Sequence, residues 1–181
     1  VRCKGDGEFF LRALCKNGTE KYHILTALKL TGEGLGAASF NPYELVLGGL
    51  HTVQTDNISN GIERGAGFAN ENSWFGFENV DFGSIGSDTV TVPIFANCTT
   101  PVKIRFYDGI PGEGGEMIGE FSYHEPPQWL TYIPNTFKLN KVLKGMHTFV
   151  MESDDGYNVQ GFVFQKPDKD RKSTRLNSSH D

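Results

Sequence analysis

The sequence predicts an all-β protein built mainly as one β-sandwich of the jelly-roll type. The chain of 181 residues contains 22 Gly, 8 Pro and 14 Phe. This composition is typical of short strands and tight turns, because Gly supplies positive φ angles and aromatic side chains fill half-buried pleated faces. Short apolar or alternating runs also recur between turn signals, as in a sandwich. With 38% hydrophobic residues, the chain is long enough to bury one full core.

Residues 38–168 carry the strands that a sandwich needs. In Thr89-Val90-Thr91-Val92, polar and apolar residues alternate, which places one set of side chains on a core face. Turn signals such as Asp108-Gly109 separate the runs. The runs predicted as strands are 43–47, 73–77, 89–95, 102–107, 117–123, 129–133, 145–152 and 159–165.

Residues 1–37 are predicted to belong to a different unit. The runs 1–4, 8–16 and 22–30 are separated by the turn signals Gly5-Asp6-Gly7 and Asn17-Gly18. Three strands alone leave an apolar face and edge groups unsatisfied. We expect them to be the C-terminal strands of a truncated immunoglobulin-like domain, followed by a glycine-rich linker to the sandwich.

Residues 169–181 are excluded from the fold prediction. Within them, DRKSTRLNSSH resembles the translation of a common sequencing adapter. We interpret this stretch as a read-through artefact of a metagenomic assembly and expect it to be disordered. A natural basic tail is the alternative. Removing residues 170–181 takes away three basic and two acidic residues, so the formal charge changes from -5 to -6.

The charge pattern bears on the kind of partner. No block of basic residues interleaved with aromatics is present, which argues against nucleic acid, because phosphate recognition needs clustered Lys and Arg. No apolar run approaches the roughly 20 residues that span a bilayer, so we expect no membrane partner. The three cysteines are too few and too irregular for a disulfide framework. A neutral ligand therefore suits the chain better than a charged polymer.

We expect no catalysis by this chain itself. Glycoside hydrolysis needs two carboxylates facing each other across a cleft, about 5 to 9.5 Å apart. The acidic residues lie in turn-rich surroundings, where solvated surface is the ordinary interpretation. No GxSxG motif is present, and His124-Glu125 lacks the second His of a zinc site. The acidic residues considered are Glu63, Glu71, Glu113, Glu116, Asp154 and Asp155.

Short motifs in the sandwich segment occur in the order found in a known family. Residues 73–96, SWFGFENVDFGSIGSDTVTVPIFA, resemble the part of family 6 carbohydrate-binding modules where a Trp-containing strand leads into NVDFG and a Val-rich strand. Further matches follow in order at 103–119, 129–132, 143–151 and 157–164. The resemblance covers about residues 40–166. It implies a galactose-binding-like jelly roll that binds carbohydrate without catalysing a reaction.

A second resemblance lies near the start of the chain. The segment KGDGEF, followed by LRA and NG within residues 4–18, is similar to the end of an accessory β-domain in bacterial glycoside hydrolase family 2 enzymes of the β-galactosidase type. It implies that the module belongs to such an enzyme, with the catalytic domain upstream in the same chain. The compartment stays open between cytoplasm and secretion.

The family resemblance also implies a sugar site. Family 6 modules clasp a sugar ring between two aromatics in loops at one end of the sandwich, while an Asn bonds the hydroxyls. By position, these residues are Phe68, Trp129 and Asn158. The family usually has Tyr where this chain has Phe68, and Phe keeps only the stacking face. Trp129 has core packing as its alternative role, and Asn158 has local turn formation.

Three further expectations follow. Trp74, Phe75, Phe77 and Tyr132 are assigned to the core. The family has a structural calcium ion, for which Glu44 is the nearest candidate ligand. Hard cations take six or more oxygens, and the sequence does not supply a full set, so calcium stays possible and unassigned. The alternative function is a structural accessory domain that packs on the parent enzyme or makes an oligomer contact, without binding sugar.

Overall fold

The protein is all-β, as the sequence predicts. The computed structural model describes residues 7–16, 22–32, 38–61, 65–68, 73–95, 100–124 and 131–167. Within these ranges, the strands are accompanied by one short 3₁₀ turn, Gly48–Leu50, and no helix is long and apolar enough to cross a membrane. The strands are β1 Gly7–Lys16, β2 Tyr22–Gly32, β3 Val46–Leu47, β4 Val53–Gln54, β5 Ile58–Gly61, β6 Gly65–Phe68, β7 Ser73–Asp81, β8 Ser87–Phe95, β9 Val102–Asp108, β10 Glu116–Tyr123, β11 Ile133–Leu143, β12 Met146–Ser153, β13 Asn158–Val159 and β14 Gly161–Phe164.

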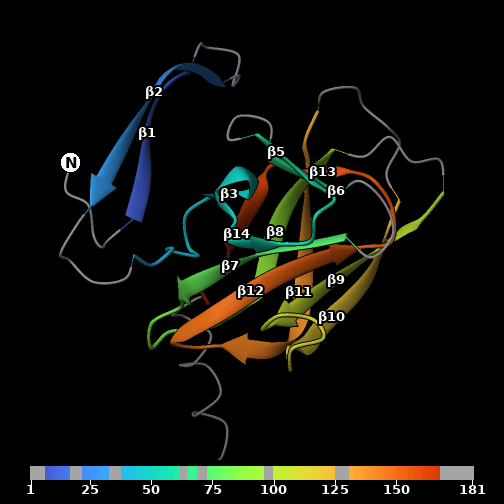
Figure 1. Ribbon diagram of the computed structural model, residues 1–181. Coiled ribbons are helices and arrows are strands. Elements are labelled where there is room, and N and C mark those ends of the chain that lie inside the picture. The colour runs from blue at the N-terminus through green and yellow to red at the C-terminus, as the bar shows by residue number, and fades with distance from the viewer. Residues whose placement is uncertain are drawn as a thin grey trace, which may run out of the picture.

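Two antiparallel sheets form the sandwich. One has five strands in the order β10-β9-β12-β7-β4. The other has seven strands, with β8 at its centre, β11 on one side, and β13 and β14 on the other. The strands of the two sheets cross in Figure 1, and β5, β6 and β13 lie together in its upper part. This arrangement confirms the predicted β-sandwich.

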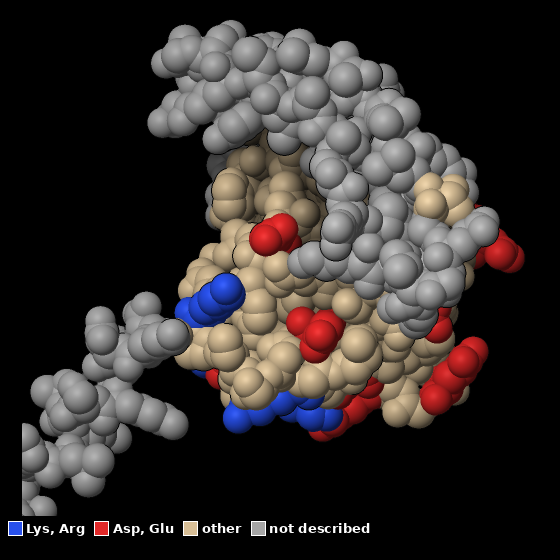
Figure 2. All heavy atoms as spheres, turned by 90° about the vertical axis from the view of Figure 1, so that its left-hand side faces the viewer, with Lys and Arg blue, Asp and Glu red and all other residues tan. Residues whose placement is uncertain are grey.

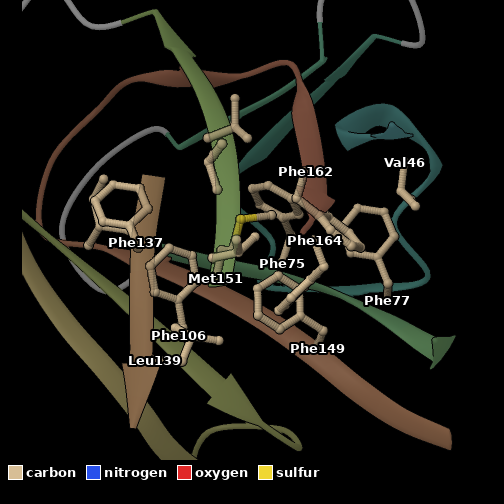
Figure 3. Packing of buried hydrophobic residues seen from close by; sticks show 14 of the residues in the cluster. Val46, Phe75, Phe77, Phe106, Phe137, Leu139, Phe149, Met151, Phe162 and Phe164 are labelled. Atoms are coloured by element: carbon tan, nitrogen blue, oxygen red, sulfur yellow. The ribbon is translucent and has the colours of Figure 1, made fainter. Parts of the chain in front are cut away.

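Phenylalanine side chains fill the space between the sheets. Phe106 and Phe149 stack with their ring centroids 5.7 Å apart, and Phe149 also meets Phe162 at 4.9 Å. Figure 3 shows rings from both sheets converging around Met151. Burial of such a side chain stabilises the fold by about 1.5–3 kcal/mol. The fully buried rings are Phe75, Phe77, Phe82, Phe106, Phe149, Phe162 and Phe164.

The N-terminal strands form a sheet of their own. β1 and β2 pair antiparallel from Gly7↔Gly32 to Lys16↔Tyr22, with an irregularity after Ala13. Two of the three strands predicted for this segment are therefore confirmed. The first predicted strand, 1–4, and the excluded tail, 169–181, lie outside the described residues. The immunoglobulin-like origin of the hairpin remains a prediction.

Three predicted strands are placed differently in the structure. The strand expected at 43–47 is reduced to Val46–Leu47. The strand expected at 129–133 begins only at Ile133 and continues to Leu143. Pro134 is its second residue, and proline is tolerated there because β11 pairs, among the described strands, with β8 alone. The strand expected at 159–165 is interrupted at Gln160, whose carbonyl accepts from the backbone N–H of Gly48 at 2.7 Å. The sequence analysis also missed the β5–β6 pair.

Candidate functional site

Connections between the two sheets gather at one end of the sandwich. Among the described strands, five successive pairs cross from sheet to sheet there: β4 to β5, β6 to β7, β8 to β9, β10 to β11 and β12 to β13. The antiparallel register brings the end of β8 beside the start of β13, since Phe95 pairs with Asn158. The start of β11 joins them, since Ile133 pairs with Ile94. We call this the loop end.

Of the three predicted site residues, the structure describes Asn158 fully and the backbone of Phe68. Asn158 opens β13 and is half-buried. The backbone of Phe68 ends the neighbouring strand β6, one residue after Gly67, which pairs with Asn158. The side chain of Phe68 and the whole of Trp129 lie outside the described residues. The backbones of Phe68 and Asn158 are therefore brought together at the loop end, and the segment with Trp129 leads into β11 at that end.

Two aromatic residues at the loop end were missed by sequence reasoning. The rings of Phe95 and Tyr132 meet at 6.1 Å between centroids, with an interplanar angle of 71°. Both side chains are half-buried, so the assignment of Tyr132 to the core is wrong. Trp74, also assigned to the core, is likewise half-buried and outside the core cluster, whereas Phe75 and Phe77 are fully buried as predicted. Partial exposure leaves the pair of rings able to offer apolar surface to a ligand.

Asn158 and Phe95 lie on the same face of the sheet. Along β8, Val90, Val92 and Ile94 are buried, so Phe95 projects from the outer face. Directly opposed residues of an antiparallel pair share a face, and Asn158 is opposite Phe95. The strand alternation was the signal that could have singled out Phe95. An amide and an aromatic ring thus stand side by side at the loop end.

An ion-pair cluster holds the other sheet at this end. The Arg105 guanidinium donates to Glu120 at 2.8 Å, Glu152 at 2.9 Å and Asp154 at 2.6 Å. The hydrogen bond from Arg105 to Asp154 is the largest cause of the raised pKa of Arg105. Lys103 also contacts Glu120, at 2.9 Å. The cluster therefore ties β9, β10 and β12 together.

The same cluster anchors the connection that leads to Asn158. Asp154, which we expected to be solvated surface, is paired with Arg105. The Ser153 hydroxyl donates to the carbonyl of Asp155 at 2.7 Å, and the Asp155 carboxylate accepts from the backbone N–H of Gly156 at 2.6 Å. These bonds set the turn before β13. The amide of Asn158 is thereby presented from a fixed backbone.

Acidic and basic side chains are paired with one another in the described part of the chain. Among the residues coloured by type in Figure 2, basic and acidic side chains lie close together along the lower rim. Glu116, also expected to be solvated, pairs with Lys141 at 2.6 Å. Glu152 and Asp154 both bind the one guanidinium of Arg105. Because Glu152 and Asp154 share Arg105 as their cation, we assign these two carboxylates a role in stabilising the fold.

Comparisons with solved structures identify the architecture. A module from Clostridium stercorarium, solved in complex with cellobiose, matches with a TM-score of 0.62 and 18% identity, covering 72% of this chain and 98% of that one. A family 6 module from Clostridium cellulolyticum, in complex with xylose, matches with a TM-score of 0.55 and 22% identity, covering 70% and 100%. The chain has the fold of family 6 carbohydrate-binding modules. No family sequence model matches the chain, and no curated protein sequence does.

Part of a larger enzyme chain is also similar to this chain. A glycoside hydrolase family 43 arabinoxylan arabinofuranohydrolase from Bacillus subtilis, in complex with cellotetraose, matches with a TM-score of 0.58 and 15% identity. The match covers 85% of this chain and 33% of the enzyme.

The family resemblance implied a structural calcium ion, with Glu44 as the nearest candidate ligand. Glu44 is exposed in a turn where its backbone N–H contacts the carbonyl of Asn41 at 3.4 Å. In the described part of the chain, no group of three or more His, Cys, Asp or Glu is placed to hold a metal ion.

Proposed function

We propose that the chain is a non-catalytic carbohydrate-binding module of a larger glycoside hydrolase of the β-galactosidase type. The observation that carries the proposal is the half-buried Phe95–Tyr132 pair beside Asn158, at the end where the connections between the sheets gather. A sugar ring has an apolar C–H face and a fringe of hydroxyls, so it needs both kinds of group. The fold supports the same function, since modules with this fold are known in complex with cellobiose and xylose.

The proposed binding mode uses Phe68 and Trp129 as the aromatic clasp and Asn158 as the hydrogen-bonding amide. Their strands or flanking segments meet at the loop end, which supports this assignment. Phe95 and Tyr132 extend the apolar surface beside Asn158. The amide has a carbonyl acceptor and two N–H donors, which suits it to adjacent hydroxyls. Stacking fixes the ring plane, and the amide fixes its orientation.

Simple energetics make this module a weak binder. Two stacking contacts contribute about 0.5–1.5 kcal/mol each, and two or three hydrogen bonds contribute about 1 kcal/mol each. Their sum is a few kcal/mol, and a dissociation constant near 1 mM corresponds to about 4 kcal/mol. A module of this strength acts by tethering. It raises the local concentration of substrate for a catalytic domain in the same chain.

The upstream partner is the finer part of the proposal. The resemblance of residues 4–18 to family 2 hydrolases supports it. A second support is the separate β1–β2 sheet, because an isolated two-stranded hairpin is at best marginally stable and needs further strands or a packing partner. A further support is the partial match to a family 43 hydrolase chain, of which it covers 33%.

Affinity electrophoresis of the full chain tests the binding function. Native gels would contain hydroxyethyl cellulose, xylan, laminarin or galactan, with bovine serum albumin as a non-binding reference. We expect retardation on at least one polymer, and its loss in Trp129→Ala and Asn158→Ala. Met117→Ala is the control, because Met117 is 48% exposed in β10, away from the loop end. If the chain is folded and no polymer retards it, the result would favour the alternative function, a structural accessory domain that binds no sugar.

A further inference from the structure

The outer face of the seven-stranded sheet continues from the loop end along β8. Below Phe95, the outward positions of β8 are Pro93, Thr91 and Thr89, each half-buried. The residues opposite them on β11 share this face, and they pair as Pro93↔Pro134, Thr91↔Thr136 and Thr89↔Lys138. Side chains from Phe95 to Thr91 are therefore uncharged on both strands. Between Phe95 and Lys138, the described outward residues of β8 and β11 form a track without a charged side chain.

Hydrogen-bonding groups on the track gather around Thr91. The hydroxyls of Thr91 and Thr136 lie 2.9 Å apart. The Gln165 side-chain amide donates to the Thr91 hydroxyl at 3.5 Å. A hydroxyl has one donor and two acceptor positions, so these contacts leave capacity for a ligand. Pro93 and Pro134 pair between the threonines and Phe95 and contribute apolar surface there.

A depression lies at the far end of this track. Its volume is about 440 Å³, within the range of about 300–1,000 Å³ typical of small-molecule sites. One part of the lining is apolar, with Ile85 and Val142 about half exposed. Another part is polar, with Gln165 and the Asp88–Lys138 ion pair at 2.5 Å. The depression thus combines half-exposed aliphatic groups with hydrogen-bonding groups.

The division into apolar and polar walls matches a pyranose ring. The C–H face of a sugar can rest on the aliphatic side chains of Ile85 and Val142. Its hydroxyls can reach the Gln165 amide and the oxygens of Asp88, which already accept from Thr89 and Lys138. Carboxylates accept more than one hydrogen bond per oxygen, so Asp88 keeps capacity for a ligand.

We propose that this depression is a second saccharide subsite, and that a single glycan chain lies along β8 from the loop end to it. The inference rests on the proposed function, because it extends the loop-end site. Six residues separate Phe95 from Thr89, which corresponds to about 20 Å along a strand. That span requires an oligosaccharide. The structure thus assigns the module to extended chains, with the depression taking a sugar unit remote from the loop end.

Ligand length is the variable that tests the inference. The full chain is titrated by calorimetry with cellobiose and cellohexaose, and with xylobiose and xylohexaose. For the series that binds, we expect the hexasaccharide to bind roughly tenfold more tightly than the disaccharide, because its second contact is intramolecular. Amide and methyl NMR shifts should reach Ile85 and Val142 with the hexasaccharide alone.

Two subsite variants and a matched control locate the extra affinity. Ile85→Ser and Gln165→Ala should bring hexasaccharide affinity down to that of the disaccharide, with disaccharide affinity unchanged. Met117→Ser removes a similarly exposed apolar side chain elsewhere and should change neither affinity. Equal affinities for the two lengths, or a hexasaccharide gain that survives both subsite variants, would overturn the second subsite while the loop-end site stands. Absence of binding by every oligosaccharide would count against the proposed function itself.

Discussion

Asn158 lies directly opposite Phe95 across the β13–β8 pair, so an amide and an aromatic ring share the outer face of the sheet at the loop end. Both residues are held in strands, Phe95 in β8 and Asn158 in β13. Phe95 ends a nine-residue strand, and Asn158 follows a turn held by Ser153 and Asp155. A rigid presentation lowers the ordering cost when a ligand binds.

Replacing Phe95 with Ala should weaken sugar binding and leave the fold intact. The ring is only half-buried and contributes one face to the site. Loss of one stacking contact of about 0.5–1.5 kcal/mol weakens binding by roughly two- to tenfold. Calorimetric titration against the polysaccharide identified by electrophoresis measures the change. Phe95→Tyr keeps the ring and serves as the control; equal weakening by both variants would refute a stacking role.

Replacing Arg105 with Met should destabilise the sandwich and loosen the turn before Asn158. Glu152 is 13% exposed and would lose its cationic partner. Leaving such a group unpaired costs about 1–3 kcal/mol. Urea unfolding monitored by tryptophan fluorescence measures the loss. Lys103→Met removes a cation that is 53% exposed, and should cost under about 1 kcal/mol. Equal costs for the two variants would show that burial of the Arg105 cluster adds nothing.

Asp108 should make stability depend on acid pH. Burial alone would raise the pKa of Asp108, but hydrogen bonds from Lys141 and His147, at 2.8 Å each, outweigh it and hold that pKa below its usual 3.8. A carboxylate with a depressed folded-state pKa contributes stability that is present above the unfolded pKa and is lost as pH falls through the folded pKa. The unfolding free energy should therefore fall below about pH 4.

Asp108→Asn tests this dependence. The variant should be less stable at pH 7, and its unfolding free energy should decline less steeply below pH 4 than that of the parent chain. Urea unfolding at several pH values supplies both curves. Asp155→Asn is a control, since Asp155 is exposed and no salt bridge to it is observed among the described residues. Parallel acid limbs for the parent chain and Asp108→Asn would contradict the assignment.

Gly161 should not tolerate a side chain. A Cβ atom there would lie 2.0 Å from the carbonyl oxygen of Val46, where β14 pairs with β3. The strands would have to separate, at a cost of about 1–3 kcal/mol or more. Thermal unfolding of Gly161→Ala measures this. Gly112→Ala is the comparison, because its φ of +82° is strained for alanine while nothing lies within 4 Å. A smaller loss for Gly161→Ala than for Gly112→Ala would contradict the close approach.

The sequence predicted the core strands well because their patterns are regular. Alternation in β8 and the run of aromatic residues in β7 marked both strands. Most of β11 was left out of the predicted strand 129–133, because Pro134, Asn135 and Asn140 are poor strand formers. The pairing of β11 with β8 overrides their local preference. Interruption of the last strand at Gln160 depends on a contact with Gly48, which is distant in sequence.

Prediction of the candidate site was limited by the same dependence on contacts between residues distant in sequence. Asn158 was named from its place in a motif, and the structure puts it beside Phe68 in the backbone register. Phe95 was seen only as the end of a strand, although its alternation with Ile94 places it outward. Phe95 and Tyr132 are neighbours because β11 pairs with β8, although the two strands are far apart in the sequence. Local patterns do not contain such long-range contacts.

An amide NMR titration of the full chain with cellobiose, xylose and galactobiose tests sugar binding at the loop end most directly. The account predicts saturable shifts from at least one sugar, concentrated at Asn158, Phe95 and Tyr132, with a dissociation constant on the order of 1 mM. Saturable shifts confined to residues away from the loop end, or unchanged spectra with every sugar at concentrations well above that value, would contradict it.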